Sequence, residues 1–224
     1  MIQQLFQGNN PELVLFDLDG TLVDSVPDLA AAIDQMRVTL GCAPAGVDKV
    51  RHWVGNGAQV LVERALADVQ KTASDKVSFD QAFPLFLAAY AEQSTLQTQL
   101  YPGVPECLEG LKARHIKLAV VTNKPLEFTH PILSALGLDS FFKVVMGGDS
   151  LPQKKPSPEP LLHAMALSGT VPERTLMVGD SKHDIAAARA AGCPVVAVPY
   201  GYNHGEPVAQ YQPDLLVNSL DLLL

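Results

Sequence analysis

Two aspartates at the end of an apolar run are the first residues whose spacing favours chemistry. Asp17 and Asp19 follow the apolar residues 13–16 and precede Gly20 and Thr21. Four apolar residues in a row are typical of a buried parallel strand, and side chains two positions apart on an extended segment point the same way. Neighbouring carboxylates repel, so such a pair needs a cation, a shared proton or two separate roles. A strand that merely ends in an acidic turn is the structural alternative.

Polar residues also follow three other strand-like segments further along the chain. These segments are residues 118–121, 143–146 and 175–178, each short and mostly apolar. Ligands of parallel sheets bind beyond the carboxyl ends of the strands, so we expect the polar groups that follow to face one site. The groups are Thr122, Asn123, Lys155, Asp180 and Asp184.

The residue types at these positions favour phosphoryl transfer. Carboxylates at Asp17 and Asp180, with no cysteine or histidine cluster, suit a magnesium ion. Thr122 and Asn123 offer donors to an anionic oxygen, and Lys155 offers a mobile charge that matches phosphate. Phosphoryl transfer needs such positioning and charge neutralisation. Taken singly, the threonine and asparagine have an alternative role as helix caps, the lysine as a solvated charge, and the later aspartates as acids favoured at a helix start.

Alternating strand and helix patterns must hold these groups in place. From residue 101 onward the chain alternates apolar strand-like runs with helical periodicity, which predicts an α/β fold with a doubly wound parallel sheet. Between the first strand and Tyr101-Pro102-Gly103, the sequence is rich in Ala, Leu, Gln and Val. Its apolar residues recur at helical spacing, and no segment has a convincing strand pattern. We therefore expect an α/β core of residues 1–26 and 99–224, with residues 27–98 inserted as a helical cap.

Three residues lead to predictions of where helices start, bend or break, which the structure can test. Ser25 is placed to cap a helix over residues 29–40, ahead of Pro27 in its first turn. Pro84 falls within a helical run and predicts a helix start or kink there, and Pro131 predicts a break in the helix over residues 126–136.

Composition restricts the partners and the compartment. The 224 residues carry a formal net charge of −8, which argues against nucleic acid or an anionic membrane as the main partner. Residues 1–10 lack the basic start and apolar stretch of a signal peptide. Three cysteines without C-x-x-C spacing are typical of buried thiols in a reducing compartment. We expect a cytoplasmic protein that acts on a small phosphorylated metabolite; its oligomeric state stays open.

The four polar segments together resemble a known enzyme family. Asp17-Leu-Asp19-Gly-Thr21, Thr122, Lys155 and the segment from Gly179 to Asp184 match, in order, the four motifs of the haloacid dehalogenase superfamily of phosphatases. The resemblance covers nearly the whole chain, with a helical cap after the first motif. Within the superfamily, the chain is most similar to bacterial phosphoglycolate phosphatases. The stretches that carry this second likeness are residues 54–57, 101–103 and 201–205.

The resemblance implies a role for each motif residue. Asp17 is expected to attack phosphorus and become an aspartyl phosphate, and Asp19 to act as general acid and then base. A Mg²⁺ ion is expected to be held by Asp17, the backbone carbonyl of Asp19, and Asp180, with Asp184 binding it directly or supporting its ligands. Thr122 and Lys155 are expected to hold the phosphoryl oxygens. Lys154 is a near-equivalent neighbour, but Lys155 directly precedes Pro156, as in the family motif.

Substrate choice is left to the cap. Arg51 is the candidate for a substrate carboxylate, because a guanidinium grips one with two hydrogen bonds, and Asn56 is a second cap candidate. The leading expectation is a Mg²⁺-dependent hydrolase of 2-phosphoglycolate. Alternatives are a phosphomutase resembling β-phosphoglucomutase, a phosphatase for another small ester, and a silent binding protein. Asp19 argues against a dehalogenase or phosphonatase, because the resemblance implies that those enzymes lack this acid.

Overall fold

A parallel sheet organises most of the structure, a computed structural model that describes residues 2–70 and 77–224. In these residues the sheet has six strands in the order β5-β4-β1-β6-β7-β8, and all neighbours run parallel. The strands are β1 (Leu13–Phe16), β4 (Lys117–Val121), β5 (Val144–Met146), β6 (Thr175–Gly179), β7 (Val195–Ala197) and β8 (Leu215–Leu216). The predicted α/β class with a parallel sheet is confirmed.

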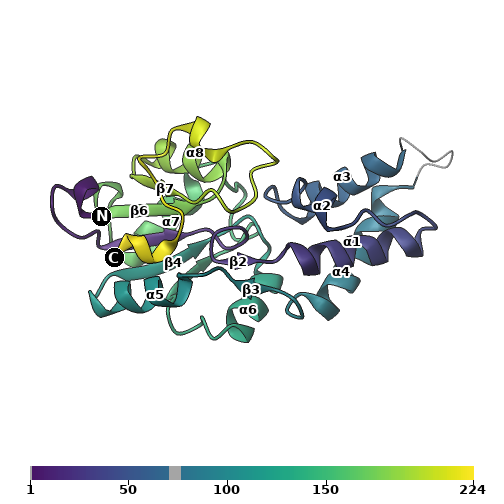
Figure 1. Ribbon diagram of the computed structural model, residues 1–224, viewed down its shortest axis with the longest axis horizontal. Coiled ribbons are helices and arrows are strands. Elements are labelled where there is room, and N and C mark those ends of the chain that lie inside the picture. Colours follow the sequence, from purple (N-terminus) through teal and green to yellow (C-terminus); the bar gives the residue numbers. More distant parts are fainter. Residues whose placement is uncertain (1, 71–76) are drawn as a thin grey trace.

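Helices cover both faces of this sheet (Figure 1). Val14 and Phe16 of β1 point to the face packed by α5 (Val104–Ala113) and α6 (Leu126–Ala135). Leu13 and Leu15 point to the opposite face, packed by α7 (Glu159–Ser168) and α8 (Lys182–Ala191). Because both faces are buried, every residue of β1 is apolar. Short 3₁₀ turns complete this part: η1 (Ile2–Phe6), η2 (Pro172–Arg174), η3 (Val208–Tyr211) and η4 (Leu220–Leu223).

Four helices form a second unit beside the sheet, at the right of Figure 1. They are α1 (Val26–Thr39), α2 (Val47–Arg51), α3 (Ala58–Gln70) and α4 (Phe79–Gln93). Their buried side chains, among them Ile33, Val62 and Phe86, form a core of their own, which Phe128 of α6 and Tyr202 also join. We call this unit the cap. Apolar contacts therefore join the cap to the sheet unit.

The chain enters and leaves the cap through two paired strands that the sequence did not predict. Val23 of β2 (Val23–Asp24) lies opposite Leu100 of β3 (Gln99–Leu100), in an antiparallel pair. Strands of two residues are too short to show a hydrophobic period, so the sequence pattern does not predict them. The expected cap boundaries at 26/27 and 98/99 lie beside these strands, and residues 71–76 of the expected cap lie outside the described residues.

Three local predictions are corrected by the structure. Ser25 precedes α1, but its hydroxyl caps no helix N–H and donates instead to Asp19 Oδ1 at 2.5 Å. Pro131 lies inside α6 and does not break it, and Pro84 lies inside α4, so no helix starts there. A kink at Pro84 stays a prediction. A proline removes one helical hydrogen bond, and burial of the neighbouring apolar faces, including Phe86 and Ile132, offsets that loss.

In the described part of the chain, no helix combines the length and the apolar character needed to cross a bilayer. Cys42, Cys107 and Cys193 are all free thiols, and the last two are buried. Burial raises the pKa of the Cys107 and Cys193 thiols to about 12.

Candidate active site

Asp17 lies directly after β1, where the loops from the neighbouring strands meet. Its Oδ1 accepts a hydrogen bond from the Leu18 backbone N–H at 2.7 Å and lies 2.9 Å from Lys155 Nζ. No hydrogen bond from the described residues reaches its second oxygen. Asp17 and Asp19 line the same cavity, as their two-residue spacing predicted. Asp17 thus offers one carboxylate oxygen that has no hydrogen-bond partner among the described residues.

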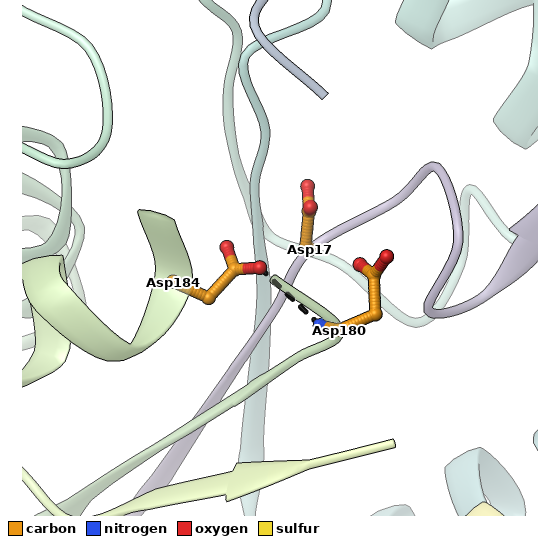
Figure 2. Close-up of side chains that lie close together, drawn as sticks. All are labelled: Asp17, Asp180 and Asp184. Atoms are coloured by element: carbon orange, nitrogen blue, oxygen red, sulfur yellow. Dashed lines mark hydrogen bonds between the residues drawn. The ribbon is translucent and has the colours of Figure 1, made fainter. Parts of the chain in front are cut away.

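Asp17, Asp180 and Asp184 gather around one point (Figure 2). One oxygen from each lies within 4.8 Å of the others. Asp180 follows β6, and its two oxygens accept from Thr21 Oγ1 at 2.9 Å and from the Tyr202 N–H at 2.5 Å. Asp184 lies in the first turn of α8. These contacts fix the carboxylates at short separation, an arrangement that favours a shared cation.

The helix start itself holds Asp184. Its Oδ2 accepts from the Ser181 backbone N–H at 3.0 Å and from the Ser181 hydroxyl at 2.7 Å. The Asp180 N–H reaches the same oxygen at 3.3 Å, as the dashed line in Figure 2 marks. Since Oδ2 is occupied in this way, Oδ1 is the oxygen of Asp184 that faces Lys155, at 2.6 Å.

The three carboxylates repel one another in a buried place. Burial raises the pKa of the Asp17 carboxyl to about 7, a rise that Lys155 opposes and Asp184 reinforces. Burial, together with Asp184 and Asp17, also raises the pKa of Asp180 well above its usual range. A divalent cation removes this repulsion, and hard oxygen ligands are those Mg²⁺ prefers. The donor set therefore fits Mg²⁺.

Lys155, and not its neighbour Lys154, is brought to the acids. The Lys155 side chain is 2% exposed, and its Nζ contacts both Asp17 and Asp184. Burial would lower the pKa of Lys155, but the two carboxylates outweigh it and raise the pKa above its usual value. Lys154 Nζ instead donates to the Asn56 carbonyl at 2.8 Å. Lys155 is thus a fixed positive charge beside Asp17.

Thr122 and Asn123 follow β4 and both line the cavity, but their side chains make different hydrogen bonds. Thr122 Oγ1 accepts from the Lys124 N–H at 3.2 Å. The Asn123 Nδ2 donates to the Gly55 carbonyl at 3.2 Å and to the Lys155 carbonyl at 3.1 Å. The predicted amide donors of Asn123 are therefore engaged within the protein, where they join the cap loop to the site.

Four residues at the site were missed by sequence reasoning. Lys124 ion-pairs with both oxygens of Asp19, at 3.0 and 3.1 Å. Ser25 bonds Asp19, and Thr21 and Tyr202 bond Asp180. The only signal for Lys124 was its place directly after Thr122 and Asn123. Ser25 lies six residues from Asp19, but its spacing does not show that its hydroxyl contacts this acid and not a helix N–H.

Apolar side chains form the other part of the cavity. They come from the cap helices α1, α3 and α4 and from α6: Leu29, Leu61, Phe86, Tyr90 and Phe128. The cavity is thus polar where the core loops line it and apolar where the cap helices and α6 line it.

The two expected cap residues make contacts outside this lining. Among the described residues, the lining includes neither Arg51 nor Asn56. Arg51 Nη2 lies 3.4 Å from Asp24 Oδ2, and its guanidinium lies 5.3 Å from the centre of the Tyr202 ring. Asn56 Nδ2 lies 2.7 Å from His183 Nε2. Both side chains link the cap to the rest of the molecule, so a role of either in substrate binding stays a prediction.

A family model described as haloacid dehalogenase-like hydrolase matches residues 14–198, most of the chain. The chain belongs to this family. The match covers all four polar segments, so the resemblance inferred from the motifs is confirmed.

Members of the family with similar sequences share one printed name. A phosphoglycolate phosphatase from Pseudomonas putida is 51% identical over 99% of this chain and 82% of the relative. One from Nitrosococcus oceani is 47% identical over 94% of this chain and 93% of the relative. A solved structure described as a predicted phosphoglycolate phosphatase from Haemophilus somnus has a TM-score of 0.93 at 42% identity, covering 96% of this chain and 97% of that one.

A more distant structure keeps the fold with a bound anion. CbbY from Rhodobacter sphaeroides in complex with phosphate has a TM-score of 0.79 at 25% identity, over 95% of this chain and 96% of that one.

Proposed function

We propose that the chain is a Mg²⁺-dependent phosphatase that converts 2-phosphoglycolate to glycolate and inorganic phosphate. The observation that carries the proposal is the setting of Asp17: one oxygen with no hydrogen-bond partner among the described residues, beside Lys155 and two further buried carboxylates. The relatives at 47–51% identity are named phosphoglycolate phosphatase, which supports 2-phosphoglycolate as the substrate.

In the first step, Asp17 attacks phosphorus and the ester oxygen leaves. A new bond joins an Asp17 oxygen to phosphorus, the bond from phosphorus to the ester oxygen breaks, and Asp19 gives its proton to the leaving alkoxide. In the second step, a water oxygen bonds to phosphorus and gives a proton to Asp19. The bond between phosphorus and the Asp17 oxygen breaks, which releases phosphate and restores the Asp17 carboxylate. Asp17 and Asp19 line one cavity, which supports this pairing of roles.

The remaining polar groups hold the phosphoryl group. Lys155 neutralises its charge next to Asp17, and Thr122 offers a hydroxyl from the end of β4. Asn123 orients the cap loop instead, because both of its amide contacts go to backbone carbonyls. Asp17, the Asp19 carbonyl and Asp180 would hold Mg²⁺, with Asp184 beside them. When bound, the ion supplies further charge neutralisation on the phosphoryl oxygens.

Phosphate release from a panel of small esters, with and without Mg²⁺, tests the proposal in wild type and Asp17→Asn. We expect Mg²⁺-dependent release led by 2-phosphoglycolate, and loss of at least about 10³-fold in kcat in the variant, because an amide is a poor nucleophile. Asparagine keeps the shape of the site, and circular dichroism checks the fold.

Other results would point elsewhere. Faster release from a different ester would keep the chemistry and reject the substrate. No phosphate release from any ester, combined with sugar phosphate turnover that requires a bisphosphate activator, would favour the phosphomutase. No reaction under either condition would favour a silent binding protein. A folded Asp17→Asn variant with full activity would reject the aspartyl phosphate route.

A further inference from the structure

Lys124 is a buried cation with a fixed place at the boundary between the polar and apolar parts of the cavity. Its side chain is 5% exposed. The backbone on either side of it is held, because its N–H donates to Thr122 Oγ1 and its carbonyl accepts from the Gly148 N–H at 2.9 Å. Its Nζ lies 4.9 Å from the centre of the Tyr90 ring, which belongs to α4 of the cap. The ammonium is thus held between the core loop and the cap.

The other charged residues of the described cavity lining are both acids, Asp17 and Asp19. Among the described residues that line the cavity, Lys124 is the only cation. Around it stand Phe86, Tyr90 and Phe128, which bring no charge of their own. A second anionic group on a substrate would lose its hydration here, and burying a charge without a partner is costly. Such a group therefore requires Lys124.

Two arginines of the neighbouring cap, Arg51 and Arg64, make contacts elsewhere. Arg51 pairs with Asp24. Arg64 donates to the Trp53 carbonyl at 2.6 Å and to Asn56 Oδ1 at 2.8 Å. Neither belongs to the described lining of the cavity. The cap thus supplies apolar surface, and the charge comes from the core loop.

We propose that Lys124 binds the carboxylate of the substrate and selects phosphate esters of 2-hydroxy carboxylic acids. An ammonium group has three N–H donors, and Asp19 engages Lys124 Nζ through both its oxygens. The remaining donor receives the substrate carboxylate. This inference rests on the proposed function, in which Asp19 serves the leaving oxygen.

The short distance between Lys124 and Asp19 sets the length of the substrate. An anion that reaches Nζ while the ester oxygen lies beside Asp19 must be only one or two carbon atoms from that oxygen. A carboxylate on the ester-bearing carbon satisfies this requirement. The distal hydroxyl groups of a sugar phosphate carry no charge for Lys124 to neutralise, and a longer chain would place its carboxylate among the apolar residues.

The test compares 2-phosphoglycolate with ethyl phosphate, which has the same two-carbon chain without the carboxylate. In Lys124→Gln, the glutamine amide still donates to Asp19, but the charge is gone. We expect kcat/KM for 2-phosphoglycolate to fall about 30- to 100-fold, since removing one partner of a buried ion pair is strongly unfavourable. For ethyl phosphate we expect a smaller fall, which reports the loss of the ion pair with Asp19 alone, so the preference for 2-phosphoglycolate over ethyl phosphate should drop about tenfold or more. Lys154→Gln is the matched control and should leave kcat/KM for both esters unchanged, because Lys154 Nζ bonds the Asn56 carbonyl and not an acid of the site.

Each outcome separates this proposal from the function on which it rests. If wild type hydrolyses neither ester, the proposed function fails. Suppose that wild type hydrolyses 2-phosphoglycolate and that Lys124→Gln lowers kcat/KM for both esters by the same factor. Lys124 then acts only through Asp19, and the selectivity proposal is rejected. Should Lys124→Gln not fold, Lys124→Arg retains the charge and must keep a preference for 2-phosphoglycolate over ethyl phosphate. In wild type, glycolate must also inhibit at concentrations where ethanol does not; equal inhibition would overturn the proposal.

Discussion

The two halves of the cavity are built on different plans. The half around Asp17 adjoins a charged cluster from the sheet unit, built from loops and from the start of α8. Oxygens of its three carboxylates lie within 4.8 Å of one another, and Lys155 contacts Asp17 and Asp184. The half around Tyr90 is mostly contributed by cap helices, and its described lining is apolar except for Lys124 and the edge of the first half. Charge is dense in one half and nearly absent in the other.

This difference separates chemistry from selection. Changes in the charged half should affect every phosphate ester alike, because all esters share the phosphoryl group. Changes in the apolar half should affect esters according to the group they carry. Residues outside both halves should affect neither. The predictions below, with those for Asp17 and Lys124, test this separation.

The largest of these effects is expected at Lys155. Lys155→Met removes the buried charge beside Asp17 and Asp184, and we expect kcat to fall about 10²- to 10³-fold, as when one stabilising donor of an active site is lost. Phosphate release should fall by the same factor for 2-phosphoglycolate and ethyl phosphate. Lys154→Met is the control and should retain activity within a few fold. A loss of phosphate release from only one of the two esters would contradict the separation of chemistry from selection.

A smaller effect is expected at Gly201, which touches the site only through Asp180. A Cβ at this position would collide with the Asp180 side chain and the Gly20 carbonyl. Gly201→Ala should therefore displace Asp180 and raise the Mg²⁺ concentration for half-maximal activity about 10- to 100-fold, as is usual when the support of a ligand is disturbed. Both esters should respond equally, and excess Mg²⁺ should restore activity. Gly169→Ala, at the end of α7, meets no neighbouring atom but is strained by the positive φ of 63°. It should lower stability and leave the Mg²⁺ requirement unchanged.

The smallest effect is expected at Arg51. Its side chain is 37% exposed, pairs with Asp24 and lies outside the described lining. Arg51→Ala should change KM for 2-phosphoglycolate by less than about twofold, since exposed ion pairs contribute little. Steady-state kinetics on both esters measures it. A large rise in KM for 2-phosphoglycolate alone would return Arg51 to the role that the sequence suggested and would weaken the case for Lys124.

The charged half could be predicted from sequence because its parts are local. Each acid or lysine follows a strand, and parallel strands bring their carboxyl ends to one edge, so spacing alone placed Asp17, Asp180 and Lys155 together. The apolar half could not be predicted in the same way. Whether Tyr90 or Arg51 faces the cavity depends on how the cap packs against the core, which no local pattern encodes. Lys124 lay in a predicted loop, but its pairing with Asp19 depends on distant backbone geometry.

The paired strands β2 and β3 have a consequence for how such a molecule can change over time. Val23 lies opposite Leu100 and Asp24 opposite Gln99, and the Asp28 carboxylate ties the N–H groups of Gln97 and Thr98 to the start of α1. The two ends of the insertion therefore meet at one place, where a tight hairpin turn would also close the chain. Replacing the cap segment between β2 and β3 with another segment would leave the strand order of the sheet unchanged. The cap is in this sense a cassette, so selectivity can be replaced whole while the catalytic loops are inherited unaltered.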